Sequence, residues 1–345
     1  MPRTRLAPSP TGALHLGNAR TFLVNWALAR QRGWEIVLRI EDLDGPRVNP
    51  AAAAEGIDVL RWLGIDWDEG PTFQRSDLSP YWTALERLAW QGDIYPCRCT
   101  RREIEAAALS APHGDEHELR YPGTCRPRKL PSLEGRGRGR DSTQPVEFAL
   151  PTLDKLASSE IPLLTPPFEG GGSEVAWRLM VPDGATAFTD QIAGLHSHDV
   201  QSTSGDFLVA TKEGLPSYQL AVVVDDARQR IDCVVRGDDL LRSTHRQLLL
   251  QQRLGLGPPP EYFHLPLVLG EDGRRLAKRH GDSRVSHYRS LGVPAERIIG
   301  LVAEWCGLGV RQEISAGDFL QRFDLSRLPP SPIVFTPADD AWLRG

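Results

Sequence analysis

The first forty residues hold the pattern that most restricts how this 345-residue chain can fold. Residues 2–8 are expected to form a short strand, and residues 34–40 (WEIVLRI) are an apolar run typical of a buried parallel strand. Between them, residues 18–31 carry apolar side chains at helical spacing, and Gly33 marks the end of that helix. A strand, a helix and a strand in so short a segment predict a βαβ unit, and therefore an α/β fold of the nucleotide-binding type.

The rest of the chain continues the alternation of helices and strands. Further helices are expected at residues 51–63, 79–91 and 243–254, the last with Ser243 as its N-cap. Residues 216–226 and 231–236 are predicted to be paired strands that return to the same sheet. Residues 127–145 are rich in Pro, Gly and Arg and are expected to form a loop. After residue 293 the pattern is mainly helical to about 323.

Composition excludes several classes of protein. The net charge of −5 argues against a general nucleic-acid binder, although it permits a local basic face. No run approaches the ~18 apolar residues of a membrane span, and prolines and arginines interrupt the N-terminus where a signal peptide would be apolar. A cytoplasmic protein without a membrane partner is expected. Of five cysteines, Cys97 and Cys99 are too close for a disulfide, so a metal or redox role is considered first.

The stretch RLAPSPTGALHLGNAR (residues 5–20) has the features of an anion site. A glycine-containing turn leads from the first strand into a helix N-terminus, where backbone N–H groups and the helix dipole favour phosphate. His15 in this turn can donate a hydrogen bond to a phosphate oxygen whose charge rises during a reaction. Gly17 lets a flat base or a ribose approach the backbone. A capped turn with a surface histidine is the alternative.

This stretch, followed by LRIEDLD (residues 38–44), resembles the start of the catalytic core of the glutamyl-tRNA synthetases, which are class I aminoacyl-tRNA synthetases. The tetrad from His15 to Asn18 resembles their HIGH signature, with asparagine in place of the second histidine. The resemblance implies that ATP is bound here and that His15 is catalytic. The ATP-binding positions that it implies in this stretch are Thr11, Gly12, His15, Gly17 and Asn18.

The resemblance also implies a site for L-glutamate. Two carboxylates and an ammonium group require guanidinium groups and an acidic partner, which Arg5, Arg236 and Glu41 supply. Glu41 follows the strand 34–40, and ligands of parallel sheets bind beyond the carboxyl ends of strands. Without the resemblance, Glu41 would be taken as a surface charge and Tyr218 as a core aromatic. The implied glutamate-binding positions are Arg5, Leu6, Ala7, Pro8, Ser9, Glu41, Tyr218 and Arg236.

A basic segment, GEDGRRLAKRHGD (residues 270–282), is flanked by glycines. A loop of this kind suits a group that clamps a triphosphate only during the reaction. It resembles the KMSKS loop of the family, with Arg275 in place of the first lysine and Ala277 in place of the first serine. The resemblance assigns Lys278 to the ATP phosphates, with Mg²⁺ accompanying ATP. A solvated loop is the alternative.

Three cysteines suggest a metal site. Cys97 and Cys99 precede Cys125, and thiolates suit tetrahedral zinc. On bond chemistry alone, His113 and His117 compete for the fourth position, and three reduced cysteines without metal are the alternative. The resemblance favours Cys97, Cys99, Tyr121 and Cys125 as the ligands of one structural Zn²⁺.

The resemblance implies a division of the chain. A Rossmann-type parallel-sheet domain is expected, with an inserted zinc-containing, acceptor-like subdomain and a short helical C-terminal stem region. The expected boundaries are 1–92 and 196–265 for the two halves of the Rossmann domain, 93–195 for the insertion, and 266–345 for the lysine loop, stem and tail. Only 66 residues follow Arg279, which is too few for the anticodon-binding domain of the larger enzymes.

This organisation resembles the branch of the family that activates glutamate with ATP and transfers it to the queuosine base in the anticodon of tRNA(Asp). The implied partners are L-glutamate, ATP and tRNA(Asp) carrying queuosine, and a monomer is expected. Two alternatives stay open, an enzyme that charges the 3′ end of a tRNA and a non-catalytic RNA-binding paralogue. A basic face for RNA phosphates is a further expectation, with a solvated loop as its alternative, and its residues are Arg126, Arg128, Lys129, Arg136, Arg138 and Arg140.

Overall fold

A computed structural model describes residues 1–10, 12–43, 48–109, 120–127, 175–274, 276 and 282–345. Its main sheet has seven strands in the order β3-β2-β1-β9-β10-β6-β7. The strands are β1 (Arg3–Leu6), β2 (Glu35–Ile40), β3 (Glu69–Phe73), β6 (Thr186–Asp190), β7 (Gly194–His198), β9 (Cys233–Gly237) and β10 (Glu261–Leu265). All neighbours pair in parallel except β6 and β7, which form an antiparallel hairpin. The predicted α/β fold with a mostly parallel sheet is confirmed.

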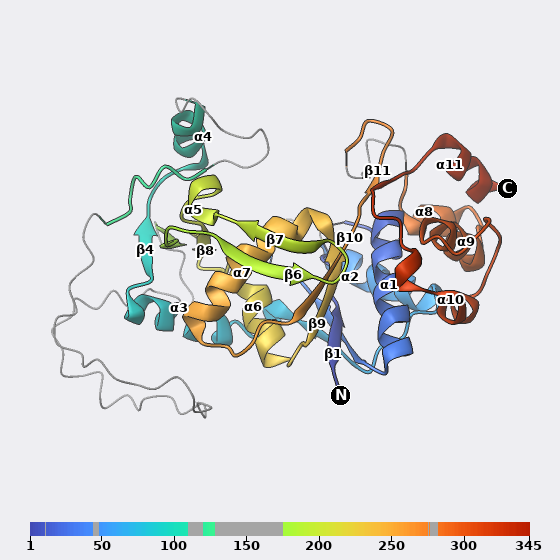
Figure 1. The fold of residues 1–345 in the computed structure, drawn as a ribbon, viewed down its shortest axis with the longest axis horizontal. Coiled ribbons are helices and arrows are strands. Elements are labelled where there is room, and N and C mark those ends of the chain that lie inside the picture. The colour runs from blue at the N-terminus through green and yellow to red at the C-terminus, as the bar shows by residue number, and fades with distance from the viewer. Residues whose placement is uncertain (11, 44–47, 110–119, 128–174, 275, 277–281) are drawn as a thin grey trace.

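Helices cover both faces of this sheet (Figure 1). On one face lies α1 (Leu16–Arg32), which packs against β1, β2 and β9 and, on its outer side, against α9 (Ala295–Trp305) and α10 (Ala316–Arg322). On the other face lie α6 (Tyr218–Arg228) and α7 (Leu241–Leu254), which share a second apolar core with α3 (Ser79–Gln91). Helix α1 ends at Gly33, whose φ of 66° is in the left-handed region, as the sequence predicted.

The strand predicted at residues 216–226 is wrong, because this segment forms α6. Its three consecutive valines favour a strand locally, yet Ser217 caps the segment as a helix by accepting a hydrogen bond from the Leu220 amide. The valines are then buried in the core shared with α3 and α7, so tertiary packing overrides the local preference. The strand expected at 231–236 is confirmed as β9. Ser243 lies inside α7, whose N-cap is Leu240.

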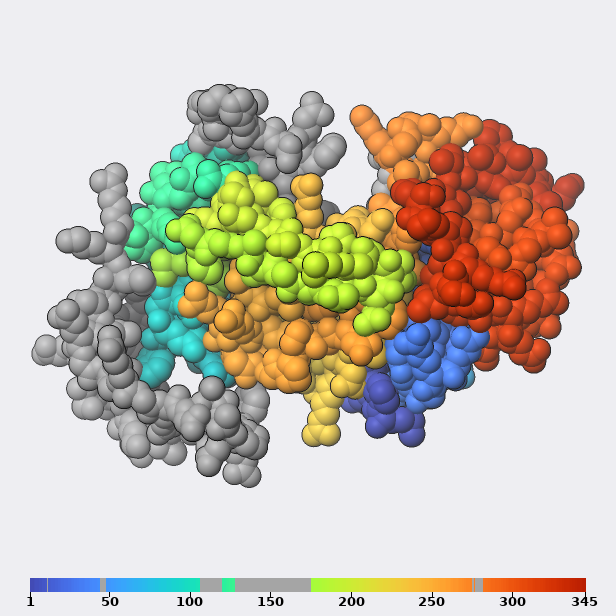
Figure 2. Space-filling model, in the orientation of Figure 1, coloured from blue at the N-terminus to red at the C-terminus, as the bar shows by residue number. Residues whose placement is uncertain are grey.

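The other expected helices are confirmed. Residues 51–63 correspond to α2 (Pro50–Trp62), and residues 79–91 to α3. The C-terminal part contains α8 (Val285–Ser290) and α11 (Pro337–Arg344) beside α9 and α10, with a small parallel pair of β11 (Val268–Leu269) and β12 (Ile333–Val334). Figure 2 shows these red elements packed beside the blue N-terminal region at one end of the molecule.

The opposite end of the molecule holds a smaller antiparallel sheet (Figure 1). Its strands are β4 (Ile94–Cys97), β5 (Ala176–Leu179) and β8 (Leu208–Ala210), in the order β4-β5-β8. Near it lie α4 (Arg101–Leu109) and the short α5 (Val200–Thr203). Among the residues that the structure describes, no helix has the length and apolar character needed to cross a membrane.

Candidate active site and metal centre

Apolar and polar side chains alternate along the neighbouring strands β2, β1, β9 and β10. This alternation places a row of polar side chains on one face of the main sheet. In a strand, successive side chains point to opposite faces. The apolar members of these strands, such as Leu6, Leu38 and Val235, belong to the core around α1. The residues between them face the layer of α6 and α7 instead. They include Arg5, Arg39, Arg236 and His264, all at most 5% exposed.

The carboxyl ends of β1, β2 and β9 bring the predicted glutamate-binding residues together. Strands β1 and β9 are neighbours, while the chain continues from β1 to β2 on one side and from β9 to β10 on the other. This is the switch point at which ligands of open α/β sheets bind. The Glu41 amide donates to the carbonyl of Pro8 at 3.1 Å, which holds the segment after β1 against the end of β2. Arg5 and Arg236 reach the same region from β1 and β9.

Partly buried carboxylates compensate the buried cations of this row. Arg39 pairs with Asp226 at 2.8 Å and with Glu41 at 3.2 Å, and Arg5 lies 3.4 Å from Asp226. Burial acts to lower the pKa of Arg39, but the attraction of Asp226 and Glu41 outweighs it and raises that pKa. Burial also raises the pKa of Glu41, and this rise is opposed by Arg39 and Arg5. Sequence reasoning missed Arg39 and Asp226.

The predicted residue Tyr218 begins α6 and is 37% exposed. Desolvation first, and then the nearby Glu41 carboxylate, raises the pKa of its hydroxyl, while Arg236 and Arg5 lower it. The four side chains that the glutamate hypothesis relies on are therefore within electrostatic reach of one another. Leu6, Ala7, Pro8 and Ser9 follow Arg5 at the same end of β1.

The turn predicted to bind phosphate, before α1, contacts the residues that directly follow the basic loop 270–282. His15 is the N-cap of α1, and its Nδ1 lies 2.9 Å from the hydroxyl of Ser283. Two backbone hydrogen bonds, from Leu16 to Ser283 and from Val285 to Leu14, join the same segments. The end of the basic loop is thus fixed beside the helix N-terminus at which phosphate is expected. Thr11 and Lys278 lie outside the described residues.

The remaining predicted ATP positions lie in or beside this turn. Asn18 accepts a hydrogen bond from the His15 amide at 3.3 Å and so closes the cap of α1. A Cβ at Gly17 would meet the side chain of Val268 at 3.5 Å, which is an ordinary contact, and a Cβ at Gly12 would meet no atom within 4 Å. No close contact among the described residues therefore requires glycine at either position.

The three predicted cysteines converge at the end of β4. The sulfur atoms of Cys97, Cys99 and Cys125 all lie within 4.8 Å of one another, the one such group of His, Cys, Asp or Glu side chains among the described residues. The hydroxyl of Tyr121 lies 3.4 Å from the Cys97 sulfur and 3.7 Å from the Cys99 sulfur. His113 and His117 lie outside the described residues.

This donor set fits a tetrahedral zinc ion. Zn–S bonds of about 2.3 Å in a tetrahedron separate the sulfur atoms by about 3.8 Å, and the sulfur atoms of Cys99 and Cys125 are 3.6 Å apart. Arg178 donates to the Cys97 sulfur at 3.3 Å, and its guanidinium lies 3.8 Å from the centre of the Tyr121 ring. A cation at this position offsets the excess negative charge of several thiolates around one divalent ion.

The loop that carries Cys125 is tied to the rest of the small sheet. The Tyr121 amide donates to the Ser204 carbonyl at 2.9 Å. At Gly205, φ is +66° and a Cβ would lie 2.6 Å from the Tyr121 carbonyl oxygen, so only glycine allows this approach. Arg126 donates to Asp206 at 3.1 Å and to the Val181 carbonyl at 3.1 Å.

Arg126 is the one residue of the expected basic face that lies among the described residues. It holds the cysteine loop on the small sheet through these bonds, and its contact with RNA phosphates stays a prediction. The other five cations of that expectation, Arg128, Lys129, Arg136, Arg138 and Arg140, lie outside the described residues.

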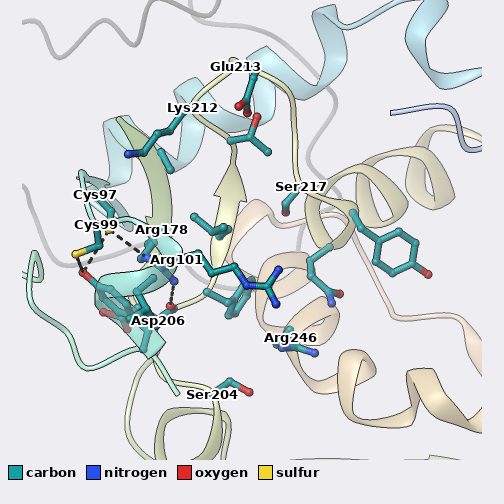
Figure 3. Close-up of a pocket in the computed structure, with 18 residues that line it drawn as sticks. Cys97, Cys99, Arg101, Arg178, Ser204, Asp206, Lys212, Glu213, Ser217 and Arg246 are labelled. Carbon is teal, nitrogen blue, oxygen red and sulfur yellow. Dashed lines mark hydrogen bonds between the residues drawn. The ribbon is translucent and has the colours of Figure 1, made fainter. Parts of the chain in front are cut away.

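A cavity of about 550 Å³ extends from the cysteine cluster to the start of α6 (Figure 3). Cys97 and Cys99 line one end, and Ser217 and Tyr218 line the other. Its charged lining residues are the cations Arg101, Arg178, Lys212 and Arg246 and the acidic residues Asp206 and Glu213. The cavity therefore extends from the candidate metal centre to the candidate amino-acid site.

The chain is similar in sequence to a known family and to several named relatives. The family described as tRNA synthetases class I (E and Q), catalytic domain, matches residues 2–137 and 168–335. A relative from Symbiobacterium thermophilum, named Glutamyl-Q tRNA(Asp) synthetase, is 42% identical over 99% of this chain and 98% of its own. A relative of the same name from Rhodopirellula baltica is 40% identical over 96% of this chain and 95% of its own. A Glutamate--tRNA ligase from Anaeromyxobacter sp. is 37% identical, and this chain spans 66% of it.

The fold is also similar to that of a solved glutamate-tRNA synthetase. The crystal structure of the glutamate-tRNA synthetase from Elizabethkingia anophelis is similar to this chain with a TM-score of 0.73 and 26% identity, over 99% of this chain and 69% of that one. The family match, the shared fold and the sequence identity lead to one conclusion. The chain belongs to the class I tRNA synthetases of the E and Q type, and it contains their catalytic domain.

Proposed function

We propose that this protein activates L-glutamate with ATP and transfers it to the queuosine base in the anticodon of tRNA(Asp). The observation that carries the proposal is the identity of 39–42% to three proteins named Glutamyl-Q tRNA(Asp) synthetase, over at least 95% of each of them. The charged side chains at the carboxyl ends of β1, β2 and β9 support the first half of the proposal, because they suit an amino acid with two carboxylates.

In the proposed site, Arg5 and Arg236 bind the two carboxylates of glutamate, and Glu41 binds its ammonium group. Leu6, Ala7, Pro8, Ser9 and Tyr218 complete the glutamate contacts. Thr11, Gly12, His15, Gly17, Asn18 and Lys278 contact ATP. The position of His15 supports its proposed contact with ATP, because His15 lies in the turn before α1 and beside Ser283, at the end of the basic loop.

The proposed reaction has two steps. An oxygen of the glutamate α-carboxylate attacks the α-phosphorus of ATP, the bond from that phosphorus to the bridging oxygen breaks, and glutamyl-adenylate and pyrophosphate form. His15 and Lys278 stabilise charge on the phosphates during this step. A hydroxyl of the queuosine cyclopentene ring then attacks the activated carbonyl, loses its proton and displaces AMP. Neither step requires a protein nucleophile.

The proposal includes two metal ions. Cys97, Cys99, Tyr121 and Cys125 would hold one Zn²⁺, which pins the cysteine loop to β4 and has a structural role. Mg²⁺ would accompany ATP and neutralise charge on its phosphates. The fit of the cysteine cluster to tetrahedral zinc supports the first of these assignments.

The division of the chain into parts also belongs to the proposal. Residues 1–92 and 196–265 form the two halves of the Rossmann-type domain, 93–195 the zinc-containing insertion, and 266–345 the loop, stem and tail. The small sheet β4-β5-β8 supports a separate insertion, although its third strand, β8, follows residue 195 and the hairpin β6-β7 joins the main sheet. The expected lack of an anticodon-binding domain, the cytoplasmic location and the monomeric state stay predictions.

Glutamate-dependent exchange of labelled pyrophosphate into ATP tests the first step. We expect Arg236→Ala to remove this exchange, because a substrate carboxylate loses its charge-assisted partner. Circular dichroism and thermal unfolding check that the variant is folded. Arg101→Ala is the control, because Arg101 lines the cavity that reaches Tyr218 yet is not among the proposed glutamate contacts. Undiminished exchange by folded Arg236→Ala would exclude this glutamate site.

The position of the transferred glutamate separates the main proposal from its first alternative. Nuclease digestion of the labelled tRNA followed by mass spectrometry identifies the nucleoside that carries glutamate. We expect the label on queuosine. Label on the terminal adenosine would favour an enzyme that charges the 3′ end, and absence of any glutamate-dependent exchange would favour a non-catalytic RNA-binding paralogue.

A further inference from the structure

The guanidinium of Arg236 is held on one side by three hydrogen bonds. Its Nε donates to Nε2 of His264 at 3.0 Å, and its Nη2 donates to Thr244 and to Gln247 at 2.8 Å each. Among the described residues, Nη1 has no hydrogen-bond partner although it is buried. A guanidinium is planar, so fixing Nε and Nη2 also fixes the direction in which the Nη1 hydrogens point.

The bond from Arg236 determines the state of His264. A histidine that accepts at Nε2 carries no proton there, so its one N–H must be at Nδ1. Nδ1 lies 2.6 Å from an oxygen of Asp190. Protonation of Nε2 would place two donors face to face and bring a second positive charge against Arg236. Burial, with help from Arg236, lowers the pKa of His264 to about 4, against the opposing effect of Asp190.

Backbone amides fix Asp190 in turn. Its Oδ1 accepts from the amides of Ile192 at 2.9 Å and Ala193 at 2.8 Å, and the amide of His264 lies 3.2 Å from both carboxylate oxygens. The side chains of Asp190 and His264 are fully buried. The carboxylate therefore has little freedom to turn, and the imidazole that donates to it is held in one orientation.

We propose that Asp190 and His264 are positioning residues, which hold Arg236 so that its Nη1 is presented to a carboxylate of the substrate. The pair neither touches the substrate nor exchanges a proton in the reaction. This inference rests on the proposed role of Arg236 in glutamate binding. It assigns a function to two buried polar residues, on β6 and β10, that come from distant parts of the chain.

A second chain of bonds supports the same orientation from the side of α7. The Gln247 side chain accepts from Arg236 with Oε1 and donates with Nε2 to Gln219 at 3.0 Å. Gln219 in turn donates to Ser243 at 3.1 Å and lines the cavity beside Tyr218. The guanidinium is thus clamped between a strand and a helix, which is the arrangement expected where a charged group must not reorient when the substrate arrives.

Kinetics of glutamate-dependent pyrophosphate exchange test this role. We expect His264→Leu to raise the KM for glutamate by about tenfold or more, since it removes an acceptor from a charged donor, while the KM for ATP changes by less than about twofold. His264→Gln should recover part of the loss, because its Oε1 can accept near the position of Nε2. His245→Asn is the control, a buried histidine of α7 that bonds to Thr186 at 2.7 Å.

Three kinetic results would overturn the inference: an unchanged KM for glutamate in folded His264→Leu, an equal rise of both KM values, or the same rise in His245→Asn. A ¹⁵N imidazole spectrum of the wild-type protein at pH 7 gives a readout without substrate. We expect the Nδ1–H neutral form for the signal that His264→Gln removes. The Nε2–H form or an imidazolium would contradict it. Absence of glutamate-dependent pyrophosphate exchange in the wild-type protein would refute the proposed function. The ¹⁵N imidazole spectrum would still decide whether His264 accepts a hydrogen bond from Arg236.

Discussion

Arg39 is a cation in the middle of a buried strand, and it is tolerated because acceptors surround it. It is 1% exposed, and it bonds to Asp226, Glu41 and the side chain of Gln229. Each partner comes from another element or from the end of β2. Arg39 therefore fixes the acidic side chains that lie beside the proposed ammonium site.

We expect Arg39→Met to lower the free energy of unfolding by about 3–5 kcal/mol, because two partly buried carboxylates, Asp226 and Glu41, lose a fully buried cationic partner. Urea denaturation measures this change. Arg101→Met is the control, since the pair of Arg101 with Glu105 is exposed to solvent and should contribute less than about 1 kcal/mol. Equal effects in the two variants would contradict the account of the buried charges.

The stability of the protein should fall in mild acid. The pKa of His264 is about 4 in the folded state and that of His245 is also lowered to about 4, mainly by burial, from an ordinary value of 6.5. Between pH 6.5 and 4 the unfolded chain binds protons that the folded chain does not. The free energy of unfolding therefore decreases as the pH falls through this window, by up to about 1.4 kcal/mol per pH unit for each histidine.

Urea denaturation at pH 7, 6 and 5 checks this dependence. His264→Gln removes one of the two groups, so we expect a shallower slope against pH than in the wild-type protein. An identical slope would show that His264 does not stay neutral in the folded state.

At the scale of residues, the sequence predicted the side chains proposed to contact the substrate. It did not predict Arg39 and His264, the buried side chains that bond to them. Arg5, Glu41 and Arg236 were found through a resemblance to a family motif. Arg39 was read as part of an apolar run, and His264 lies in no motif. The alternation of apolar and charged residues from Leu38 to Glu41 was a usable signal, but the other acceptors of Arg39, Asp226 and Gln229, lie on a distant part of the chain.

Among the elements, the cysteine loop depends on several weak anchors. Tyr121 bonds to the Ser204 carbonyl, Arg126 bonds to Asp206, and Cys125 lies beside Cys99. Tyr121 is also buried in a small apolar cluster with Tyr95 and Cys97. A bound metal would add further stabilisation to this loop.

We expect the purified wild-type protein to contain about one zinc per chain and Cys125→Ser to contain less than about half of that, because serine is a poor zinc ligand. Elemental analysis after purification without chelators measures the content. Cys306→Ser is the matched control, because Cys306 is buried far from the cluster on the C-terminal side. Less than about half a zinc per chain in the wild-type protein would count against the metal centre.

The predicted elements were mostly correct where one periodicity dominated, as in α1 and α3. They failed at residues 216–226, where consecutive valines suit a strand as well as a buried helix. The choice was made by packing against α3 and α7, which no local pattern reveals. The cap at Ser217 was a local signal for a helix that the valines outweighed.

On the scale of the whole molecule, a cavity lined by basic and acidic residues extends from the cysteine cluster of the small sheet to the start of α6. The sequence predicted the parallel sheet from its first βαβ unit, but the order of its strands and the place of the β6-β7 hairpin depend on pairings between distant segments. The cavity ends at Tyr218 beside the proposed glutamate site.

Transfer of labelled glutamate to tRNA tests the central claim most directly. The protein is incubated with ATP, labelled glutamate and tRNA(Asp) that carries queuosine, beside the unmodified transcript of the same tRNA. The account predicts labelling of the modified tRNA and no labelling of the transcript above the level without enzyme. Equal labelling of the two tRNAs, or labelling of neither by a protein that forms glutamyl-adenylate, would contradict it.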